Sequence, residues 1–187
     1  MTKSVAASKS LKLYFIRHGI AADKGNYPQD EDRPLTDKGE KKTRQVAERL
    51  REIDATFDLI LTSPLLRAHQ TALILQEMGL TPAVKISTSL APGGDIHNWL
   101  SWLSQWRSEG GTDLGLVGHQ PDLGDWAQIL IWGEVASATP DGVREPIVLK
   151  KAGILGLNLP HSGDPVGNSE LFWLTSPKLL LGESGIK

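Results

Sequence analysis

The chain has 187 residues, of which 40% are hydrophobic and 22% are charged, a composition that predicts one globular domain over residues 1–187. Its formal net charge of −2 at pH 7 gives no general attraction to nucleic acid or to an anionic membrane, and no segment approaches the roughly 18 apolar residues of a membrane span. The chain contains no cysteine, which excludes disulfides and thiolate chemistry, fits a reducing compartment and leads us to expect a cytoplasmic protein.

Strands and helices are expected to alternate from the start of the core, which we place at about residues 12–180, with flexible ends at 1–10 and 181–187. An apolar run at 12–16 predicts a buried strand. The loop that follows, 19–36, has a length that is often functional in compact domains. A helix is then expected to open near Thr36 or Asp37, because Asp37 and Glu40 have the spacing of a capping box.

The next elements are indicated by turn and capping residues. The apolar segment 57–61 predicts a second strand. Ser63 and Pro64 then predict a helix start, with the serine as N-cap and the proline at the first helical position. This helix is expected to run to Met78, with Gly79 just after its end.

The second half of the chain continues the alternation. A short strand at 84–86 is followed by a helix that opens at or beside Asp95, in which three tryptophans at helical spacing predict core packing: Trp99, Trp102 and Trp106. The remaining predicted elements are a strand that ends at Val117, a helix at 123–132 with Asp122 as a candidate N-cap, an exposed loop at 136–145, and strands at 154–159 and 171–175. The alternation predicts a three-layer α/β/α sandwich around a mostly parallel sheet.

Two of the predicted strands end in histidine. The first runs into Arg17-His18-Gly19, and a later one ends in Gly-His at His119. Since ligands bind at the carboxyl ends of strands in open α/β sheets, we expect the two histidines to share one site. Arg67 lies in the first turns of a helix, where backbone N–H groups and the helix dipole favour an anion. Two guanidiniums, two imidazoles and a helix N-terminus together predict a pocket for a tetrahedral dianion such as phosphate.

Such a pocket can also transfer the phosphoryl group. A neutral imidazole is a nucleophile toward phosphorus, and arginines stabilise the charge that builds on the oxygens. The phosphate-loop and dinucleotide glycine patterns do not occur, nor does a histidine pair with helix-face metal spacing, so we expect no cofactor and no metal. Arg33, on the long loop, either reaches this site or ties the loop down.

The motifs occur in the order of a known family. Arg17-His18-Gly19 resembles the signature of the histidine phosphatase superfamily, also called the phosphoglycerate-mutase-like fold. Taken together, the motifs look most like the small bacterial phosphohistidine phosphatases of the SixA type. The resemblance covers about residues 12–180 and is carried further by Arg33-Pro34-Leu35-Thr36, by the segment 63–71, by the segment 90–95, and by Gly118-His119-Gln120-Pro121.

The resemblance implies a role for each site residue. His18 would be the nucleophile that becomes transiently phosphorylated, and the phosphoryl group would be bound by Arg17, Arg67, His119 and Gly19. The implied partner is a histidine-phosphorylated protein, such as a phosphotransfer domain of two-component signalling. Larger members of the superfamily place an acidic proton donor near the site; here only Asp95 is a candidate, and it is equally suited to be a helix N-cap.

The site has only one candidate proton donor, and this favours a substrate whose leaving group needs little protonation. Expelling an alkoxide without a proton donor is costly, whereas the leaving nitrogen of phosphohistidine has a conjugate-acid pKa of roughly 6.5. The sequence therefore predicts a metal-independent phosphohistidine phosphatase. A phosphatase of small phosphomonoesters or sugar phosphates is the alternative with the same chemistry, and a phosphate-recognition module without turnover is the alternative without it.

Overall fold

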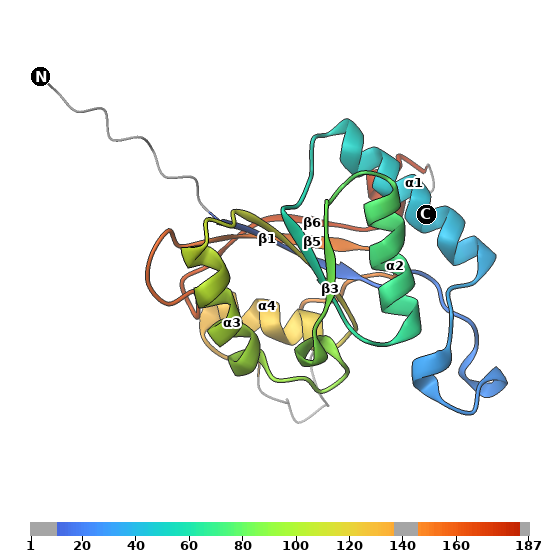
Figure 1. Cartoon of the computed structure of the whole chain (residues 1–187), viewed down its shortest axis with the longest axis horizontal. Helices are drawn as coiled ribbons and strands as arrows, with labels where there is room; N and C mark the ends of the chain where they lie inside the picture. The colour runs from blue at the N-terminus through green and yellow to red at the C-terminus, as the bar shows by residue number, and fades with distance from the viewer. Residues whose placement is uncertain (1–10, 137–145, 184–187) are drawn as a thin grey trace, which may run out of the picture.

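The computed structural model describes residues 11–136 and 146–183, and a six-stranded sheet forms its centre (Figure 1). The strand order is β3-β2-β4-β1-β5-β6. The strands are β1 (Leu11–Arg17), β2 (Leu59–Thr62), β3 (Val84–Ile86), β4 (Asp113–Gly118), β5 (Ile154–Leu159) and β6 (Glu170–Thr175). Strands β1 to β4 pair in parallel, whereas β5 is antiparallel to both β1 and β6. The sheet is therefore mostly parallel, as predicted.

Helices cover both faces of this sheet (Figure 1). One hydrophobic cluster joins the sheet to α1 (Asp37–Glu52), α2 (Leu66–Glu77) and the short α5 (Pro177–Leu180). A second cluster joins the opposite face to α3 (Ile96–Ser108) and α4 (Asp122–Trp132). This arrangement is the predicted three-layer α/β/α sandwich. None of the helices in the described ranges is long and apolar enough to cross a membrane.

Strand β1 lies in the middle of the sheet and is buried on both sides. Leu13 and Phe15 belong to the cluster under α3 and α4, whereas Tyr14 and Ile16 belong to the other cluster. This alternation explains why the strand is a continuous apolar run in the sequence. A strand anchored on both faces holds the residue that follows it, His18, in a defined position.

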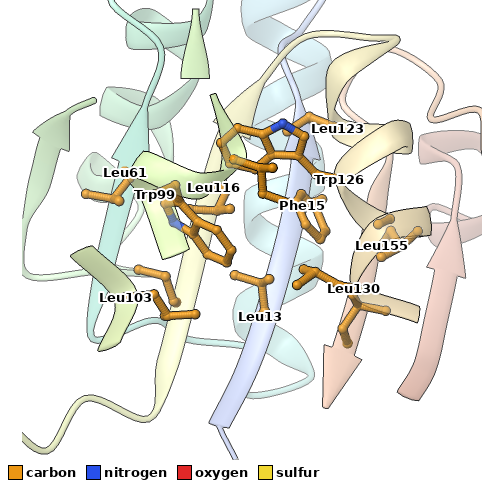
Figure 2. Packing of buried hydrophobic residues seen from close by; sticks show 14 of the residues in the cluster. Leu13, Phe15, Leu61, Trp99, Leu103, Leu116, Leu123, Trp126, Leu130 and Leu155 are labelled. Atoms are coloured by element: carbon orange, nitrogen blue, oxygen red, sulfur yellow. The ribbon is translucent and has the colours of Figure 1, made fainter. Parts of the chain in front are cut away.

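The predicted tryptophan packing holds most fully for Trp99. Figure 2 shows it between Leu103 and Phe15, and its ring lies 5.5 Å from that of Trp126. Trp102 and Trp106 are only partly buried against the same cluster, and their rings stack on each other 5.9 Å apart.

The predicted start of α1 near Thr36 or Asp37 is confirmed, but its predicted capping box and the predicted start of α2 are wrong. Helix α1 is capped by Thr36, whose Oγ1 accepts the N–H of Gly39 at 3.0 Å, rather than by a box from Asp37. The prediction that α2 starts at Ser63-Pro64 is wrong, because its N-cap is Leu65 and its first residue is Leu66. The end of α2 matches the prediction, with Gly79 at a φ of +81°.

Two further details complete the comparison with the predicted elements. Asp122 is the first residue of α4 and Pro121 is its N-cap, so the predicted capping role of Asp122 is wrong. Most of the predicted exposed loop (137–145) and the predicted flexible segments at 1–10 and 184–187 lie outside the described residues.

Candidate active site

The two histidines meet because their strands are neighbours. In the parallel pair of β1 and β4, Arg17 is in register with Gly118, so His18 and His119 both follow the same edge of the sheet. The backbone N–H of His18 donates to the carbonyl of Gly118 at 3.1 Å, and the two imidazole rings lie 5.1 Å apart. The structure thus places two imidazoles side by side at the carboxyl ends of two strands.

A cavity of about 530 Å³ opens at this edge. Its lining includes four of the predicted site residues, Arg17, His18, Arg67 and His119, together with Ala21, Arg33, Pro92, Gly93, Gln120, Pro121, Asp122 and Lys151. Three arginines and a lysine make the lining strongly basic, which suits a dianionic ligand.

His18 is oriented and neutral. Its Nδ1 lies 2.7 Å from the carbonyl oxygen of Gly19, and since a carbonyl can only accept, Nδ1 carries the proton and Nε2 keeps its lone pair. Burial, followed by the proximity of His119, lowers the pKa of His18 to about 3, despite the opposing hydrogen bond to Gly19. The ring is therefore uncharged at neutral pH, which is the state a nucleophile needs.

Gly19 supports His18 through hydrogen bonds and is not among the residues that line the cavity. Its N–H donates to Thr71 Oγ1 at 3.0 Å, and that hydroxyl donates to the carbonyl of Arg67 at 2.7 Å. A Cβ on Gly19 would lie 2.6 Å from Thr43 Oγ1, so a side chain does not fit here. The sequence predicts that Gly19 binds phosphate, but in this geometry its N–H already donates to Thr71 and is not free for a ligand. The carbonyl of Gly19 instead fixes the tautomer of His18.

His119 is held by a residue from the neighbouring strand. Its Nε2 lies 2.8 Å from Ser63 Oγ, while its buried Nδ1 has no partner among the described residues. Ser63 Oγ also accepts the N–H of Leu65 at 3.3 Å, so the hydroxyl hydrogen is available to donate to Nε2. When this hydroxyl donates to Nε2, the ring proton of His119 lies on Nδ1. Burial and the charge of Arg67 lower the pKa of His119 to about 4.

Arg67 is the most buried cation of the site, with 4% of its surface exposed. It is the second residue of α2, and its terminal nitrogens donate to Asp30: Nη1 to the backbone carbonyl at 2.7 Å and Nη2 to Oδ2 at 2.9 Å. Arg33 binds the same carboxylate at Oδ1 and also donates to the carbonyl of Ala22. The sequence left two roles open for Arg33, and the structure shows both of them: Arg33 ties down the loop and also lines the cavity.

Two other cations complete the lining. Arg17 donates from Nη1 to the carbonyl of Leu149 at 2.7 Å, a contact that fixes its guanidinium against the segment before β5. Lys151 lines the cavity with an exposed side chain that forms no ion pair within the described part of the chain.

Asp95, the candidate proton donor, caps α3. Its Oδ1 accepts the N–H of His97 at 2.8 Å, and it is not among the residues that line the cavity. The carboxylate in the lining is instead that of Asp122, whose Oδ1 accepts the N–H of Gly93 at 3.0 Å.

Several of these residues were not predicted as parts of the site. Ser63 was interpreted as a helix cap, and the sequence offers no sign that its hydroxyl faces His119. Asp30 lies in a loop with several acids, where spacing does not identify a partner for Arg67. Lys151 lies a few residues before β5, and its approach to the cavity depends on the antiparallel course of that strand.

Among the described residues, no three His, Asp or Glu side chains are grouped as metal ligands would be. The site offers instead a neutral nucleophile, two guanidiniums at its centre and an imidazole N–H. This set can bind a phosphoryl group and accept it on Nε2 of His18.

Comparison with known proteins agrees with this class of site. Residues 13–90 match the histidine phosphatase superfamily (branch 1). The chain is also 47% identical over 172 residues to an uncharacterized protein from Picosynechococcus sp., an alignment that covers 91% of this chain and 99% of that protein. The chain belongs to the histidine phosphatase superfamily, and it is a phosphatase.

Within this superfamily the chain is similar to SixA. It is 28% identical over 171 residues to the phosphohistidine phosphatase SixA of Escherichia coli, covering 89% of this chain and 94% of that protein. A solved structure of the protein histidine phosphatase SixA complexed with tungstate superposes with a TM-score of 0.76 at 27% identity, covering 91% of this chain and 99% of the other. Within the superfamily, the chain thus resembles SixA in both sequence and fold.

Proposed function

We propose that this phosphatase removes the phosphoryl group from phosphohistidine in proteins, without a metal, through a covalent intermediate on His18. The observation that carries the proposal is the state of His18. Its Nδ1–H is engaged by Gly19, its pKa is lowered to about 3, and it lines a cavity with Arg17, Arg67 and His119. A group that only bound phosphate would gain nothing from being a neutral, oriented imidazole.

The proposed reaction has two steps. First, Nε2 of His18 attacks phosphorus, and the P–N bond to the substrate imidazole breaks. The other nitrogen of the substrate ring carries a proton, so the electron pair of the breaking bond goes to the leaving nitrogen and the substrate leaves as a neutral imidazole. Second, a water attacks the phosphorus on His18, the P–Nε2 bond breaks, and inorganic phosphate leaves with the proton that the water gives up. Arg17 and Arg67 stabilise the charge on the phosphoryl oxygens in both steps.

The acids of the site support phosphohistidine as the substrate. Asp95, the candidate proton donor, is engaged as a helix cap and does not line the cavity. A leaving imidazole needs less help than an alkoxide, because its conjugate acid has a pKa of roughly 6.5. The proposed partner is a histidine-phosphorylated protein, such as a phosphotransfer domain of two-component signalling. We propose the cytoplasm as its compartment, which the lack of cysteine in the sequence fits.

One observation favours a second candidate function. Asp122 puts a carboxylate in the cavity lining, and a carboxyl group there could protonate an alcohol leaving group. A phosphatase of small phosphomonoesters is therefore the alternative, with the same nucleophile.

The experiment that tests the proposal measures phosphate release from a histidine-phosphorylated phosphotransfer domain beside an alkyl phosphomonoester, with a chelator present. We expect chelator-resistant release from the phosphoprotein, its loss in His18→Ala, and its retention in the control His161→Ala, since His161 is exposed and does not line the cavity. Release from the alkyl ester alone would establish the alternative. Equal release by wild type and His18→Ala would contradict both.

A further inference from the structure

Asp30 connects two arginines of the site. It begins a 3-10 turn, η2 (Asp30–Asp32), in the long loop between β1 and α1. Its Oδ2 accepts from Arg67 and its Oδ1 accepts from Arg33, each at 2.9 Å. Although burial alone raises the pKa of Asp30, the hydrogen bonds and charges of the two arginines outweigh it and lower that pKa below its usual value. The carboxylate is therefore charged at neutral pH and shared between the two guanidiniums.

These contacts decide which hydrogens of Arg67 are left for a ligand. A guanidinium carries five N–H hydrogens. In Arg67 one hydrogen on each terminal nitrogen donates to Asp30, and three hydrogens remain. One of the three is on Nε, which is buried and has no partner among the described residues. The other two are on the terminal nitrogens, one on each, at the end of a side chain that lines the cavity.

We propose that Asp30 is the positioning residue of Arg67: it holds one hydrogen of each terminal nitrogen and so fixes the guanidinium beside the cavity that Arg67 lines, with its other terminal hydrogens left for the phosphoryl group. This inference rests on the proposed function, because it takes the phosphoryl group as the ligand. Asp30 itself does not line the cavity, so it acts through Arg67 rather than on the reacting atoms. Arg33 secures the carboxylate in turn, because it is anchored to the carbonyl of Ala22.

A carboxylate beside two arginines has an opposite possible effect, since it can compete with phosphate for their hydrogens. The two roles predict opposite changes in anion affinity when Asp30 is replaced. Removing a competitor tightens anion binding, whereas removing a positioning residue weakens it. The remaining hydrogens of Arg67 favour positioning, because Asp30 takes one hydrogen from each terminal nitrogen and leaves the other one on each for a ligand.

The test is the affinity for tungstate, measured by calorimetry on the full chain. We expect Asp30→Ala to weaken binding about tenfold or more. The matched control is Asp32→Ala in the same turn, an exposed acid with no ion pair among the described residues, and it should change binding less than about twofold. Asp30→Asn keeps an oxygen acceptor for Arg67 and should fall between these values.

Double variants separate positioning from a general effect on the loop. In an Arg67→Ala background, Asp30→Ala should have almost no further effect, whereas in an Arg33→Ala background most of its effect should persist. Binding that is tighter or unchanged in Asp30→Ala would overturn the proposal, as would an undiminished loss in the Arg67→Ala background. If Asp30→Ala does not fold, the same criteria apply to Asp30→Asn.

This test is independent of turnover. A wild-type protein that binds tungstate but releases no phosphate from phosphohistidine contradicts the proposed function and leaves the positioning role standing. A wild-type protein that releases phosphate but shows no effect of Asp30 on tungstate binding contradicts the positioning role alone.

Discussion

Ser63 Oγ and His119 Nε2 lie 2.8 Å apart although 56 positions separate the two residues in the sequence. Ser63 follows β2 and His119 follows β4, and these strands pair in parallel with Thr62 opposite Val117. The sheet register therefore brings the hydroxyl to the imidazole. When the Ser63 hydroxyl donates to Nε2, the proton of His119 lies on Nδ1, the nitrogen without a partner among the described residues.

We expect Ser63→Ala to lower kcat/KM about tenfold, since one hydrogen bond is worth about 1–1.5 kcal/mol and its loss frees the tautomer of His119. Steady-state kinetics on the phosphoprotein measure this change. The control is Ser169→Ala, because Ser169 is also buried and hydrogen-bonded, to the carbonyl of Pro165, but lies outside the cavity lining. Wild-type kinetics in Ser63→Ala would contradict the role of this pair.

The two histidines make stability depend on pH. Burial is the main reason that the pKa of His18 falls to about 3 and that of His119 to about 4, both below the value of about 6.5 in an unfolded chain. Between these values the unfolded chain binds more protons, so stability falls as the pH falls from 6.5. From pH 7 to pH 5 the loss is about 2 kcal/mol for each histidine by linkage.

Urea unfolding at pH 7 and pH 5 measures this loss. We expect the difference to shrink in His18→Asn and to shrink further when His119→Asn is added, because a neutral side chain replaces each titrating ring. The control His161→Asn changes an exposed histidine and should leave the difference unaltered. A pH dependence that is the same in the double variant as in wild type would show that other groups cause it.

The fold could be predicted from the sequence because its strongest signals are local. The apolar run of β1 and the glycine at the end of α2 each reflect a physical requirement that a short window contains. The start of α2 could not be predicted in this way. Ser63-Pro64 has the composition of a helix start, but the chain turns through Leu65 first, and the hydroxyl of Ser63 lies against His119 instead of capping the helix.

The centre of the site could also be predicted from local sequence patterns, because parallel strands bring the residues at their carboxyl ends to one edge of the sheet. Arg17, His18 and His119 needed no further information. The supporting contacts depend on tertiary structure. Asp30 meets Arg67 across 37 positions, and its acidic neighbours in the loop have the same appearance in the sequence. The path of the loop decides which of these acids pairs with Arg67 and which are exposed to solvent.

Lys151 should affect the affinity for a protein substrate. It lines the cavity and forms no ion pair with any residue that the structure describes, so acidic side chains around a phosphohistidine would be attracted to it. We expect Lys151→Ala to raise KM for the phosphoprotein about threefold to fivefold at low salt, and less at high salt because the attraction is screened. The matched control is Lys150→Ala, an exposed neighbour outside the lining. Equal effects of the two substitutions would indicate only a general attraction by surface charge.

The last prediction concerns the two carboxylates near the segment 92–95. Asp95 caps α3, so Asp95→Ala should destabilise the fold by about 1 kcal/mol and leave turnover of the phosphoprotein near that of the wild type. Asp122 lines the cavity, and Asp122→Asn keeps the acceptor for the N–H of Gly93 while removing the acid. We expect Asp122→Asn to lower kcat for an alkyl phosphate at least tenfold and to affect phosphohistidine much less, because a leaving imidazole needs no acid of the protein. Kinetics on both substrates, with thermal unfolding as the check of stability, measure the difference. If Asp95→Ala instead abolished alkyl phosphate turnover while Asp122→Asn kept it, Asp95 would be the proton donor, and the loop that carries it would have to move toward His18 during the reaction.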